Sequence, residues 1–210
     1  MNLSAEAEAY AAADFAEVNE AFVARLLELA GDRADAVALD LGTGPGDMPI
    51  RIVRQRPGWR IVAVDASFAM LRLARRAIAE AGASHVVVPV QTDAKGCPFL
   101  SGAFDIIFSN SIVHHITDVA AFWNEVKRLA KPGGHILLRD LSRPPSPEAA
   151  RRIVETYAAH ESPLLQEEFY RSLLSAYTPD EVRTQLDAAG LEGLSVVMSS
   201  DRHWDVFSVA

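Results

Sequence analysis

Cysteine is nearly absent from this sequence. Cys97 is the single cysteine among 210 residues, so no disulfide can form within the chain. That scarcity is typical of a reducing compartment. Residues 1–13 lack the basic segment followed by an apolar run that marks a secretory signal, and no stretch approaches the roughly 20 apolar residues that span a bilayer. We therefore expect a cytoplasmic protein that does not insert into membranes.

Positive charge is also scarce. Lys and Arg total 20 against 28 Asp and Glu, which gives a formal net charge of -8 at pH 7. Proteins that grip nucleic acid usually present a basic face. The charge balance therefore argues against a nucleic-acid partner and favours a small-molecule substrate.

The rest of the sequence is typical of an α/β domain. Short continuous apolar runs alternate with segments of helical periodicity, which indicates βαβ units and a parallel sheet covered on both faces. We expect a pair of strands, 196–198 and 205–209, to close the chain. The other expected strands are 36–41, 60–65, 85–91, 104–109 and 135–141, and the expected helices are 5–30, 47–56, 67–81, 119–130, 147–160, 164–176 and 179–189.

A glycine-rich loop follows the first expected strand. Gly42, Gly44 and Gly46 alternate directly before an expected helix. Glycine lets the backbone turn sharply and lets a ligand approach without a Cβ in the way. Open α/β sheets bind ligands at the carboxyl ends of their strands. A tight turn alone is the simpler explanation, but three alternating glycines favour a binding site.

Acidic residues near this loop indicate the kind of ligand. Asp65 ends the second expected strand, where a carboxylate can accept hydrogen bonds from a ribose; alternatively, it caps the helix that begins near Ser67. The G-x-G-x-G spacing differs from the G-x-G-x-x-G of dinucleotide sites. A pyrophosphate beside Asp40 and Asp47 would be costly, whereas S-adenosylmethionine has no phosphate and carries a sulfonium and an ammonium. The loop therefore favours S-adenosylmethionine over a nicotinamide dinucleotide.

Five segments, in order, resemble the motifs of class I S-adenosylmethionine-dependent methyltransferases. The segment 40–46 looks like the first motif, and Asp65 matches the ribose-binding acid of the family. Residues 92–94 resemble the adenine motif and 104–110 the fourth-strand motif. Residues 129–134 resemble the turn before the fifth strand, with alanine where leucine is usual. The resemblance is to the small-molecule branch, which includes ubiquinone/menaquinone methyltransferases and natural-product O-methyltransferases.

This resemblance implies the fold and the reaction. The fold would be a Rossmann-like, doubly wound, mostly parallel seven-stranded sheet with an antiparallel C-terminal hairpin and a helical cap. The reaction would be transfer of a methyl group to a small acceptor by in-line displacement. In a single domain, residues 1–30 would form a helical lid, 35–141 the cofactor-binding core, 142–177 a helical insertion on the substrate side and 178–210 the last helix and hairpin.

The resemblance also implies a set of cofactor-binding residues. Two of them have a second interpretation, because Met70 can be ordinary core and Asp93 can be a turn residue. The expected set is Asp40, Gly42, Thr43, Gly44, Gly46, Asp65, Ala66, Met70, Thr92, Asp93, Ala94, Ser109, Asn110 and Ser111.

The candidates for the chemistry are His114, His115 and Asp140, because the acceptor should lie beyond the fourth and fifth strands. Histidine accepts a proton near neutral pH. Two adjacent histidines cannot easily both face the site, and the sequence does not choose between them. Asp140 would orient a base or bind the substrate, or it would form a salt bridge with Arg139 or Arg143.

Other segments carry weaker signals. Arg202 would bind an acidic substrate and His203 would act as a base, although an exposed turn is the simpler interpretation. Tyr10 and Phe15 would close over the cofactor, or Phe15 would simply pack in an amphipathic helix. Aromatic residues within 145–177 would line an acceptor pocket or form a homodimer contact.

Alternative functions are compatible with parts of the pattern. A nucleotide-dependent oxidoreductase shares the layered fold, and a non-catalytic protein could bind S-adenosylmethionine without turnover. A nucleic-acid methyltransferase would carry a motif such as Asn-Pro-Pro-Tyr after the fourth strand, where this chain has Asn-Ser-Ile-Val at 110–113. His and Asp residues show no paired metal-ligand spacing, so we expect a metal-independent enzyme.

Overall fold

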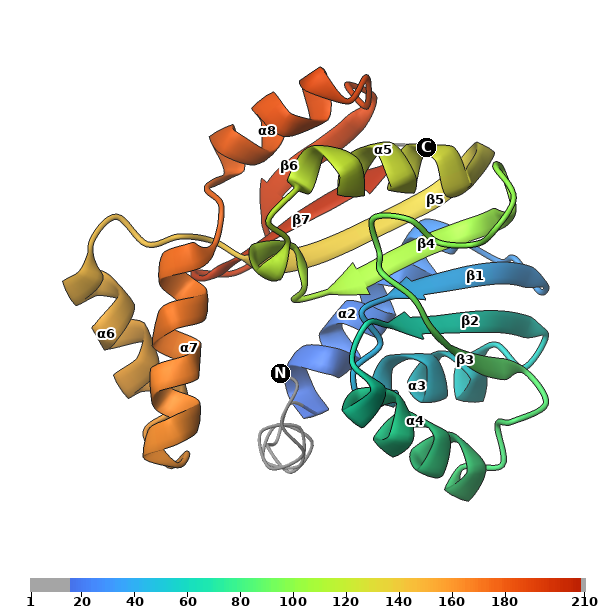
Figure 1. Ribbon diagram of the computed structural model, residues 1–210, viewed down its shortest axis with the longest axis horizontal. Coiled ribbons are helices and arrows are strands. Elements are labelled where there is room, and N and C mark those ends of the chain that lie inside the picture. The colour runs from blue at the N-terminus through green and yellow to red at the C-terminus, as the bar shows by residue number, and fades with distance from the viewer. Residues whose placement is uncertain (1–15, 209–210) are drawn as a thin grey trace.

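The computed structural model describes residues 16–208. Its centre is a seven-stranded sheet with the order β3-β2-β1-β4-β5-β7-β6 (Figure 1). The strands from β3 to β5 are parallel, whereas β7 runs antiparallel to β5 and to β6. The expected sheet and its antiparallel hairpin are therefore confirmed. The strands are β1 (Ala36–Leu41), β2 (Trp59–Asp65), β3 (Val87–Gln91), β4 (Phe104–Asn110), β5 (Ala130–Leu141), β6 (Leu194–Met198) and β7 (His203–Ser208).

Helices cover both faces of the sheet (Figure 1). One face carries α2 (Ala16–Ala30), α3 (Asp47–Gln55) and α4 (Phe68–Glu80), and the other carries α5 (Val119–Leu129) and α8 (Pro179–Ala188). Successive residues of a strand point to opposite faces. In β4, Ile106 and Phe108 pack with α2 and α3, whereas Ile107 packs with α5. Two buried faces explain why these strands are apolar throughout.

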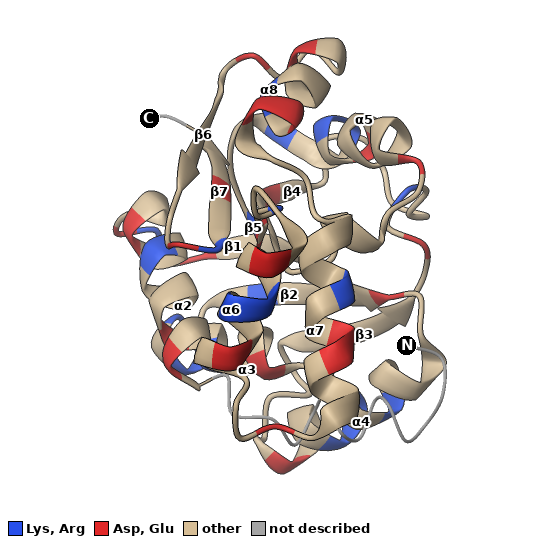
Figure 2. Ribbon diagram, turned by 90° about the vertical axis from the view of Figure 1, so that its left-hand side faces the viewer, with Lys and Arg blue, Asp and Glu red and all other residues tan. Residues whose placement is uncertain are grey.

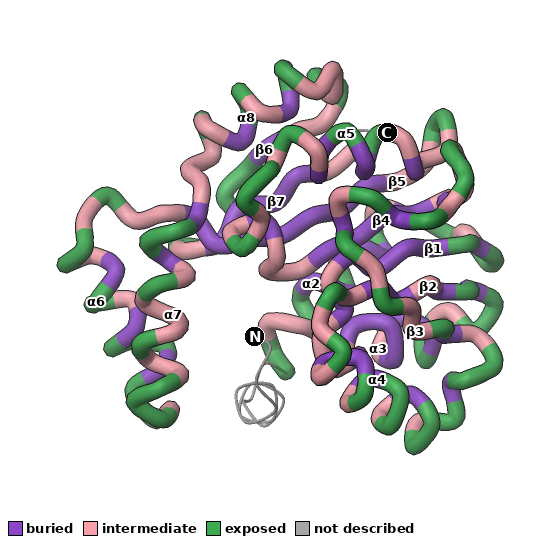
Figure 3. The backbone as a smooth tube through the Cα atoms, viewed as in Figure 1, coloured by how far each residue is buried: buried purple, intermediate pink, exposed green. Residues whose placement is uncertain are grey.

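Two helices form a hairpin beyond the carboxyl ends of the parallel strands. They are α6 (Pro147–Tyr157) and α7 (Pro163–Ser175), which pack on each other and on Leu141 through a small apolar cluster of their own (Figure 1). Figure 2 looks at this edge of the molecule, and both acidic and basic segments occur on α6. The hairpin is largely exposed or half-buried, unlike the sheet (Figure 3). Both helices lie within residues 142–177, where the sequence indicates helices, and the role of this segment toward a substrate stays a prediction.

The start of β5 differs from the expectation. The strand begins at Ala130 rather than at His135, and its register on β4 jumps from Phe104↔Ala130 to Ile106↔His135. Residues 131–134 of β5 therefore stand opposite the single residue Asp105 of β4. This irregular segment includes Gly133, whose φ is 72°, and Gly134, where a Cβ would lie 3.0 Å from the Lys131 carbonyl oxygen. The Pro-Gly-Gly segment is thus an irregularity within a strand and not a turn before it.

The chain ends also differ from the expectation in extent. β7 begins at His203 rather than at 205, so His203 and Trp204 belong to the sheet. Helix α2 is described from Ala16 onward, and the expected lid residues Tyr10 and Phe15 lie outside the described residues.

Candidate active site

The glycine loop between β1 and α3 folds back onto β2. The amides of Gly42 and Thr43 both donate to the Val64 carbonyl, at 2.9 and 2.8 Å. Gly42, Gly44 and Gly46 have φ values of 78°, 54° and 87°, in the left-handed region that strongly favours glycine. The alternating glycines are therefore required by the path of the backbone.

The loop is also closely packed on two sides. A Cβ on Gly42 would lie 2.1 Å from Ile112 Cγ2, and a Cβ on Gly46 would lie 3.2 Å from Ala74 of α4. In contrast, nothing lies within 4 Å of the Cβ position of Gly44. A ligand can therefore approach the backbone at Gly44, whereas neighbouring side chains and backbone fill the space beside Gly42 and Gly46.

Asp65 fixes the conformation of this loop. Its Oδ2 accepts a hydrogen bond from the Gly44 amide at 2.9 Å, and its Oδ1 accepts one from the Ser67 amide at 2.8 Å. Ser67 in turn caps α4, because its Oγ accepts a hydrogen bond from the Met70 amide. Burial raises the pKa of Asp65 above its usual value. Asp65 does not itself cap α4, because Ser67 is the N-cap; Asp65 instead fixes the Ser67 amide and keeps other lone pairs of its carboxylate free.

Two buried polar atoms beside the loop make no hydrogen bond of good geometry within the described residues. They are Oδ2 of Asp40, which is only 2% exposed, and Oγ1 of Thr43. The Thr43 side chain nevertheless lies close enough to Asp40 to offset part of the effect of burial on its pKa. Burial raises the pKa of Asp40 to about 7. A buried polar group without a partner is costly, typically by about 1–3 kcal/mol. A ligand that brings donors and positive charge would satisfy both atoms, so the site fits the ammonium end of S-adenosylmethionine.

The other expected cofactor residues gather at the ends of β2 and β3. The Thr92 amide donates to the Asp65 carbonyl, and the Ala66 carbonyl accepts from the Gln91 side chain. Ala94 is buried, as is Met70. The exposed Asp93 carboxylate accepts hydrogen bonds from the Lys95 amide and ammonium. The roles of these residues toward a cofactor stay predictions.

The end of β4 is fastened to its neighbours by side chains and backbone. Ser109 is fully buried, and its Oγ donates to the Leu41 carbonyl at 2.7 Å, so this hydroxyl ties β4 to β1. Ser111 has a φ of 63°, an uncommon conformation for a residue other than glycine. Its amide donates to the Arg139 carbonyl. The chain therefore leaves the sheet sharply at this point.

Asn19 of α2 is a residue that sequence reasoning missed. Its Nδ2 donates to Asp47 Oδ2 at 2.8 Å, and its Oδ1 accepts from Asn110 Nδ2 at 3.4 Å. Arg51 Nε donates to the same Asp47 oxygen. Helix α2 is thus tied to the first turn of α3 and to the end of β4. The only signal in the sequence was a polar residue one turn before the buried Phe22.

His114 is held by Asp140. Both histidines lie in a short 3-10 helix, η1 (Val113–His115). The Asp140 carboxylate is fully buried, and its Oδ1 lies 2.5 Å from His114 Nδ1. It also accepts hydrogen bonds from the amides of Val113 and Leu141, at 2.5 and 2.6 Å. The two backbone donors hold the carboxylate in place, and the carboxylate in turn orients the imidazole.

His115 has a different environment. Its ring centroid lies 4.0 Å from that of His114, but no hydrogen bond holds it among the described residues. His115 is exposed overall, yet the buried part of its ring and the adjacent His114 lower its pKa to about 4. Of the two histidines, only His114 has a carboxylate partner.

The alternative pairings for Asp140 are wrong. Arg139 forms a two-pronged ion pair with Asp205 of β7, at 2.7 and 2.8 Å, and Arg143 pairs with Glu181. Adjacent residues of a strand point to opposite faces. Arg139 and Asp140 therefore cannot meet on one face of β5.

Arg202 and His203, in the hairpin of β6 and β7, already interact with neighbouring residues. Arg202 forms an ion pair with Asp201 and stacks on the Tyr157 ring, with 3.4 Å from its Cζ to the ring centroid. His203 is buried in β7 beside Ser200, and burial lowers its pKa to about 4. Such a histidine is a poor base near neutral pH. Cys97 is buried as well, and burial raises the pKa of its thiol to about 11, which makes it unreactive.

Residues 16–208 contain neither a membrane-spanning helix nor a cluster of metal ligands. No helix in this range combines the length and the apolar character that crossing a membrane requires. The same residues bring together no group of three or more His, Cys, Asp or Glu that could hold a metal ion.

Comparison with known proteins places this geometry in context. The family model described as "Methyltransferase domain" matches residues 39–138. The chain is 27% identical over 176 residues to the ubiquinone/menaquinone biosynthesis C-methyltransferase UbiE of Hahella chejuensis, covering 79% of this chain and 70% of that protein. It is 34% identical over 130 residues to the demethylmenaquinone methyltransferase of Thermus thermophilus, covering 62% and 57%.

A solved structure supports the fold. A methyltransferase from Aquifex aeolicus that depends on S-adenosylmethionine superposes with a TM-score of 0.73 and 18% sequence identity. The match covers 98% of this chain and 97% of that one.

Proposed function

We propose that the chain acts as a class I methyltransferase that depends on S-adenosylmethionine, and that it methylates a small organic acceptor with His114 as the general base. The observation that carries the assignment of the base is the 2.5 Å contact between His114 Nδ1 and the fully buried Asp140. A carboxylate on one ring nitrogen fixes the tautomer and leaves the other nitrogen to accept a proton.

The residues of the glycine loop would hold the cofactor. When bound, S-adenosylmethionine supplies an electrophilic methyl group on a sulfonium. The free lone pairs of Asp65 suit ribose hydroxyls. Asp40 Oδ2 and Thr43 Oγ1, which make no hydrogen bond of good geometry within residues 16–208, suit the polar end of the ligand. The open Cβ position of Gly44 leaves room for close approach to the backbone.

His114 is suited to proton transfer away from water. Its side chain is 4% exposed, and α7 packs near η1, so the fold shields this imidazole from bulk water. Exclusion of water strengthens electrostatic interactions in a site and prevents side reactions. An acceptor that loses a proton to Nε2 becomes a stronger nucleophile, on oxygen, nitrogen or an activated carbon.

The relatives suggest which acceptor to test first. Their names specify demethylmenaquinone and the biosynthesis of ubiquinone and menaquinone. Methylation at carbon needs an electron-rich ring, so demethylmenaquinone reduced to its quinol is the first choice. A net charge of -8 argues against nucleic acid as an acceptor. A homodimer and a cytoplasmic location stay predictions.

Two measurements test the proposal. Calorimetric titration should show that wild-type protein binds S-adenosylmethionine and that Asp65→Ala weakens binding at least about tenfold, because charge-assisted hydrogen bonds are lost. Turnover of the quinol should then be measured in buffer with EDTA, since we propose a metal-independent reaction. His114→Gln should lower kcat about 100- to 10,000-fold, the range that a general base contributes, with little change in cofactor affinity.

His115→Gln is the matched control, because it removes the same functional group one residue away. We expect its kcat to stay within about tenfold of the wild type. Equal losses in the two variants would contradict the choice of His114. Cofactor binding without turnover of any acceptor would instead favour a non-catalytic role, and absence of binding would contradict the cofactor assignment.

A further inference from the structure

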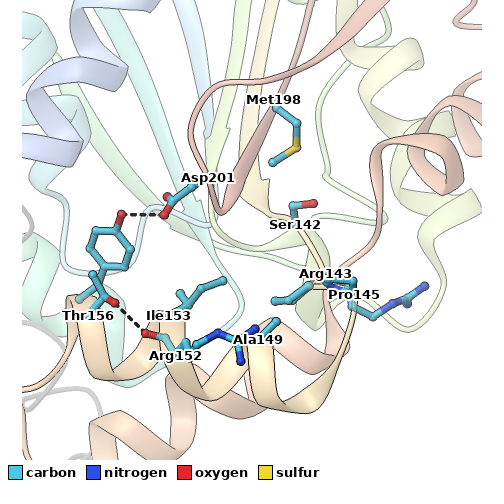
Figure 4. Close-up of a pocket in the computed structure, with 11 residues that line it drawn as sticks. Ser142, Arg143, Pro145, Ala149, Arg152, Ile153, Thr156, Met198 and Asp201 are labelled. Carbon is cyan, nitrogen blue, oxygen red and sulfur yellow. Dashed lines mark hydrogen bonds between the residues drawn. The ribbon is translucent and has the colours of Figure 1, made fainter.

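A pocket of about 440 Å³ lies apart from the glycine loop and from the His114–Asp140 pair. It is formed where α6 faces the turn between β6 and β7 (Figure 4). Ligand pockets in proteins are typically about 300–1,000 Å³, so a metabolite-sized molecule fits. The lining residues that matter here are Arg143, Arg152, Ile153, Tyr157, Met198 and Asp201.

One wall of this pocket is fixed by contacts between distant segments. Tyr157 Oη donates to Asp201 Oδ2 at 2.7 Å, which joins the end of α6 to the β6–β7 turn (Figure 4). Arg202 covers the Tyr157 ring and forms an ion pair with Asp201 at 3.0 Å. The wall is therefore built into the fold and exists before any ligand arrives.

Some of the arginine side chains around the pocket have partners within the protein, and one does not. Arg143 is engaged by Glu181 and by the Ala176 carbonyl, and Arg202 is engaged by Asp201. Arg152 makes no side-chain hydrogen bond or ion pair within residues 16–208. Its charge has a longer-range electrostatic interaction with Glu148. On a chain with a net charge of -8, Arg152 is a cation available to a ligand.

Apolar surface lies next to this cation. Ile153 follows Arg152 on α6, and the Met198 side chain, which is 47% exposed, lies across the pocket on β6 (Figure 4). Pro145 adds to the wall on the side of the loop after β5. A ligand that fills the pocket would therefore contact apolar side chains along its body and a guanidinium at its end.

We propose that this pocket binds a small organic anion with an apolar body, a carboxylate or phosphate monoester whose charged group pairs with Arg152. A guanidinium binds both oxyanions through paired N–H donors. Ile153 and Met198 pack against the apolar part. Because the pocket shares no residue with the cofactor loop or with His114 and Asp140, this binding does not depend on the proposed general base.

The test uses the full chain labelled with ¹⁵N and titrated with sodium octanoate. We expect saturable shifts of the α6 amides, at Ile153 and Thr156 among others, both with and without S-adenosylmethionine. Octyl phosphate distinguishes the two oxyanions, and 1-octanol is the uncharged probe of the same length. Octanoate should bind at least about tenfold more tightly than 1-octanol, because the charged hydrogen bonds require the anion.

The adjacent arginine supplies a matched control. Arg151→Gln makes the same change of charge one residue away, where the Arg151 guanidinium covers the Tyr170 ring at 4.5 Å and does not line the pocket. Arg152→Gln should weaken octanoate binding about tenfold and Arg151→Gln should leave it unchanged. Equal affinities in the two variants, octanol binding as tight as octanoate binding, or the absence of saturable shifts on α6 would each overturn the proposal.

Discussion

The two halves of this molecule make their sites in different ways. In residues 36–94 the proposed cofactor site consists mostly of backbone: a glycine loop with left-handed φ values, held by amides that donate to Val64 and Asp65. In residues 104–208 the structure depends instead on side-chain pairs from distant segments. His114 and Asp140 are 26 residues apart, Arg139 and Asp205 are 66 apart, and Tyr157 and Asp201 are 44 apart.

This difference suggests that one half suits a constant ligand, the cofactor, and the other half suits an acceptor that differs between enzymes. A backbone loop presents similar donors and acceptors whatever side chains surround it, so it suits one constant ligand. Side-chain pairs change with single substitutions, so they suit a variable acceptor. Three substitutions would test the contrast, each aimed at the feature on which its half depends.

The largest effect is expected from Gly42→Ala in the backbone-built half. The new Cβ would lie 2.1 Å from Ile112 Cγ2, and the φ of 78° disfavours any side chain. Strain and overpacking together should cost about 3–5 kcal/mol of unfolding free energy and abolish measurable cofactor binding in calorimetry.

Gly82→Ala is the control for this substitution, because Gly82 has a φ of 69° and open space around its Cβ position. It should cost only about 1 kcal/mol and leave cofactor affinity unchanged. Similar losses in both variants would show that backbone strain alone, and not the contact with Ile112, governs the loop.

A comparable loss of stability, but without loss of cofactor binding, is expected from Asp205→Ala in the half built from side-chain pairs. Arg139 and Asp205 are both buried, so removal of the carboxylate leaves a buried guanidinium without its partner. Loss of one partner of a buried pair costs about 3–5 kcal/mol, measurable by urea unfolding. Cofactor affinity of the folded fraction should not change.

The double variant Arg139→Met/Asp205→Leu tests whether the stability at this position depends on the ion pair or on the packing of the two side chains. Because apolar residues of similar volume often replace a buried pair without loss, the double variant should recover most of the lost stability. A double variant as unstable as Asp205→Ala would mean that β5 and β7 need the ion pair itself.

The smallest effect is expected from Asp40→Asn, and it depends on pH. Because burial raises the pKa of Asp40 in the native state from 3.8 to about 7, the native state holds this proton more tightly than the unfolded chain does. The stabilising effect is complete below pH 4 and is lost as the pH rises toward 7 and above. Asparagine cannot ionise and avoids this loss.

Without ligand, Asp40→Asn should therefore be more stable than the wild type at pH 8, by at most about 4 kcal/mol, since one pKa unit corresponds to about 1.4 kcal/mol. The difference should shrink as the pH falls toward 4. Urea unfolding across this range measures it, and a difference independent of pH would contradict the raised pKa. Cofactor affinity should fall in the variant, because the carboxylate is lost.

The sequence predicted the backbone-built half well because its signals are local. Gly42, Gly44 and Gly46 mark the loop within a few residues, and Ser67 was recognisable as a helix cap. Continuous apolar strands separated by amphipathic helices were enough to predict the parallel sheet. Each of these signals acts over one turn or one strand, which is the range that a single sequence reports.

The other half was only partly predictable because its contacts are not local. The sequence offered Arg139, Arg143 and a role beside a base as alternatives for Asp140, and the structure places Asp140 on His114. The sequence alone is enough to exclude the salt bridge between Asp140 and Arg139, because adjacent residues of a strand point to opposite faces. The contact with His114 required the position of η1, and no pattern in the sequence indicated a 3-10 helix there.

The sequence indicated that residues 145–177 could line a pocket, but it did not show where the pocket lies beside α6. The aromatic residues of 145–177 suggested an acceptor pocket or a dimer contact, without choosing between them. The hydrogen bond from Tyr157 to Asp201 joins an insertion helix to a hairpin turn, and only the folded chain reveals that the two segments meet. The bulge at the start of β5 was hidden for a similar reason, because Pro-Gly-Gly is compatible with a turn and with a break in register.

Asp65 has one more consequence. A carboxylate offers about four acceptor positions, and the amides of Gly44 and Ser67 occupy two of them. The loop is thus preorganised by these two hydrogen bonds, and two acceptor positions remain for the ribose diol that we propose Asp65 binds. We therefore expect the loop to bind a nucleoside with little rearrangement of its backbone.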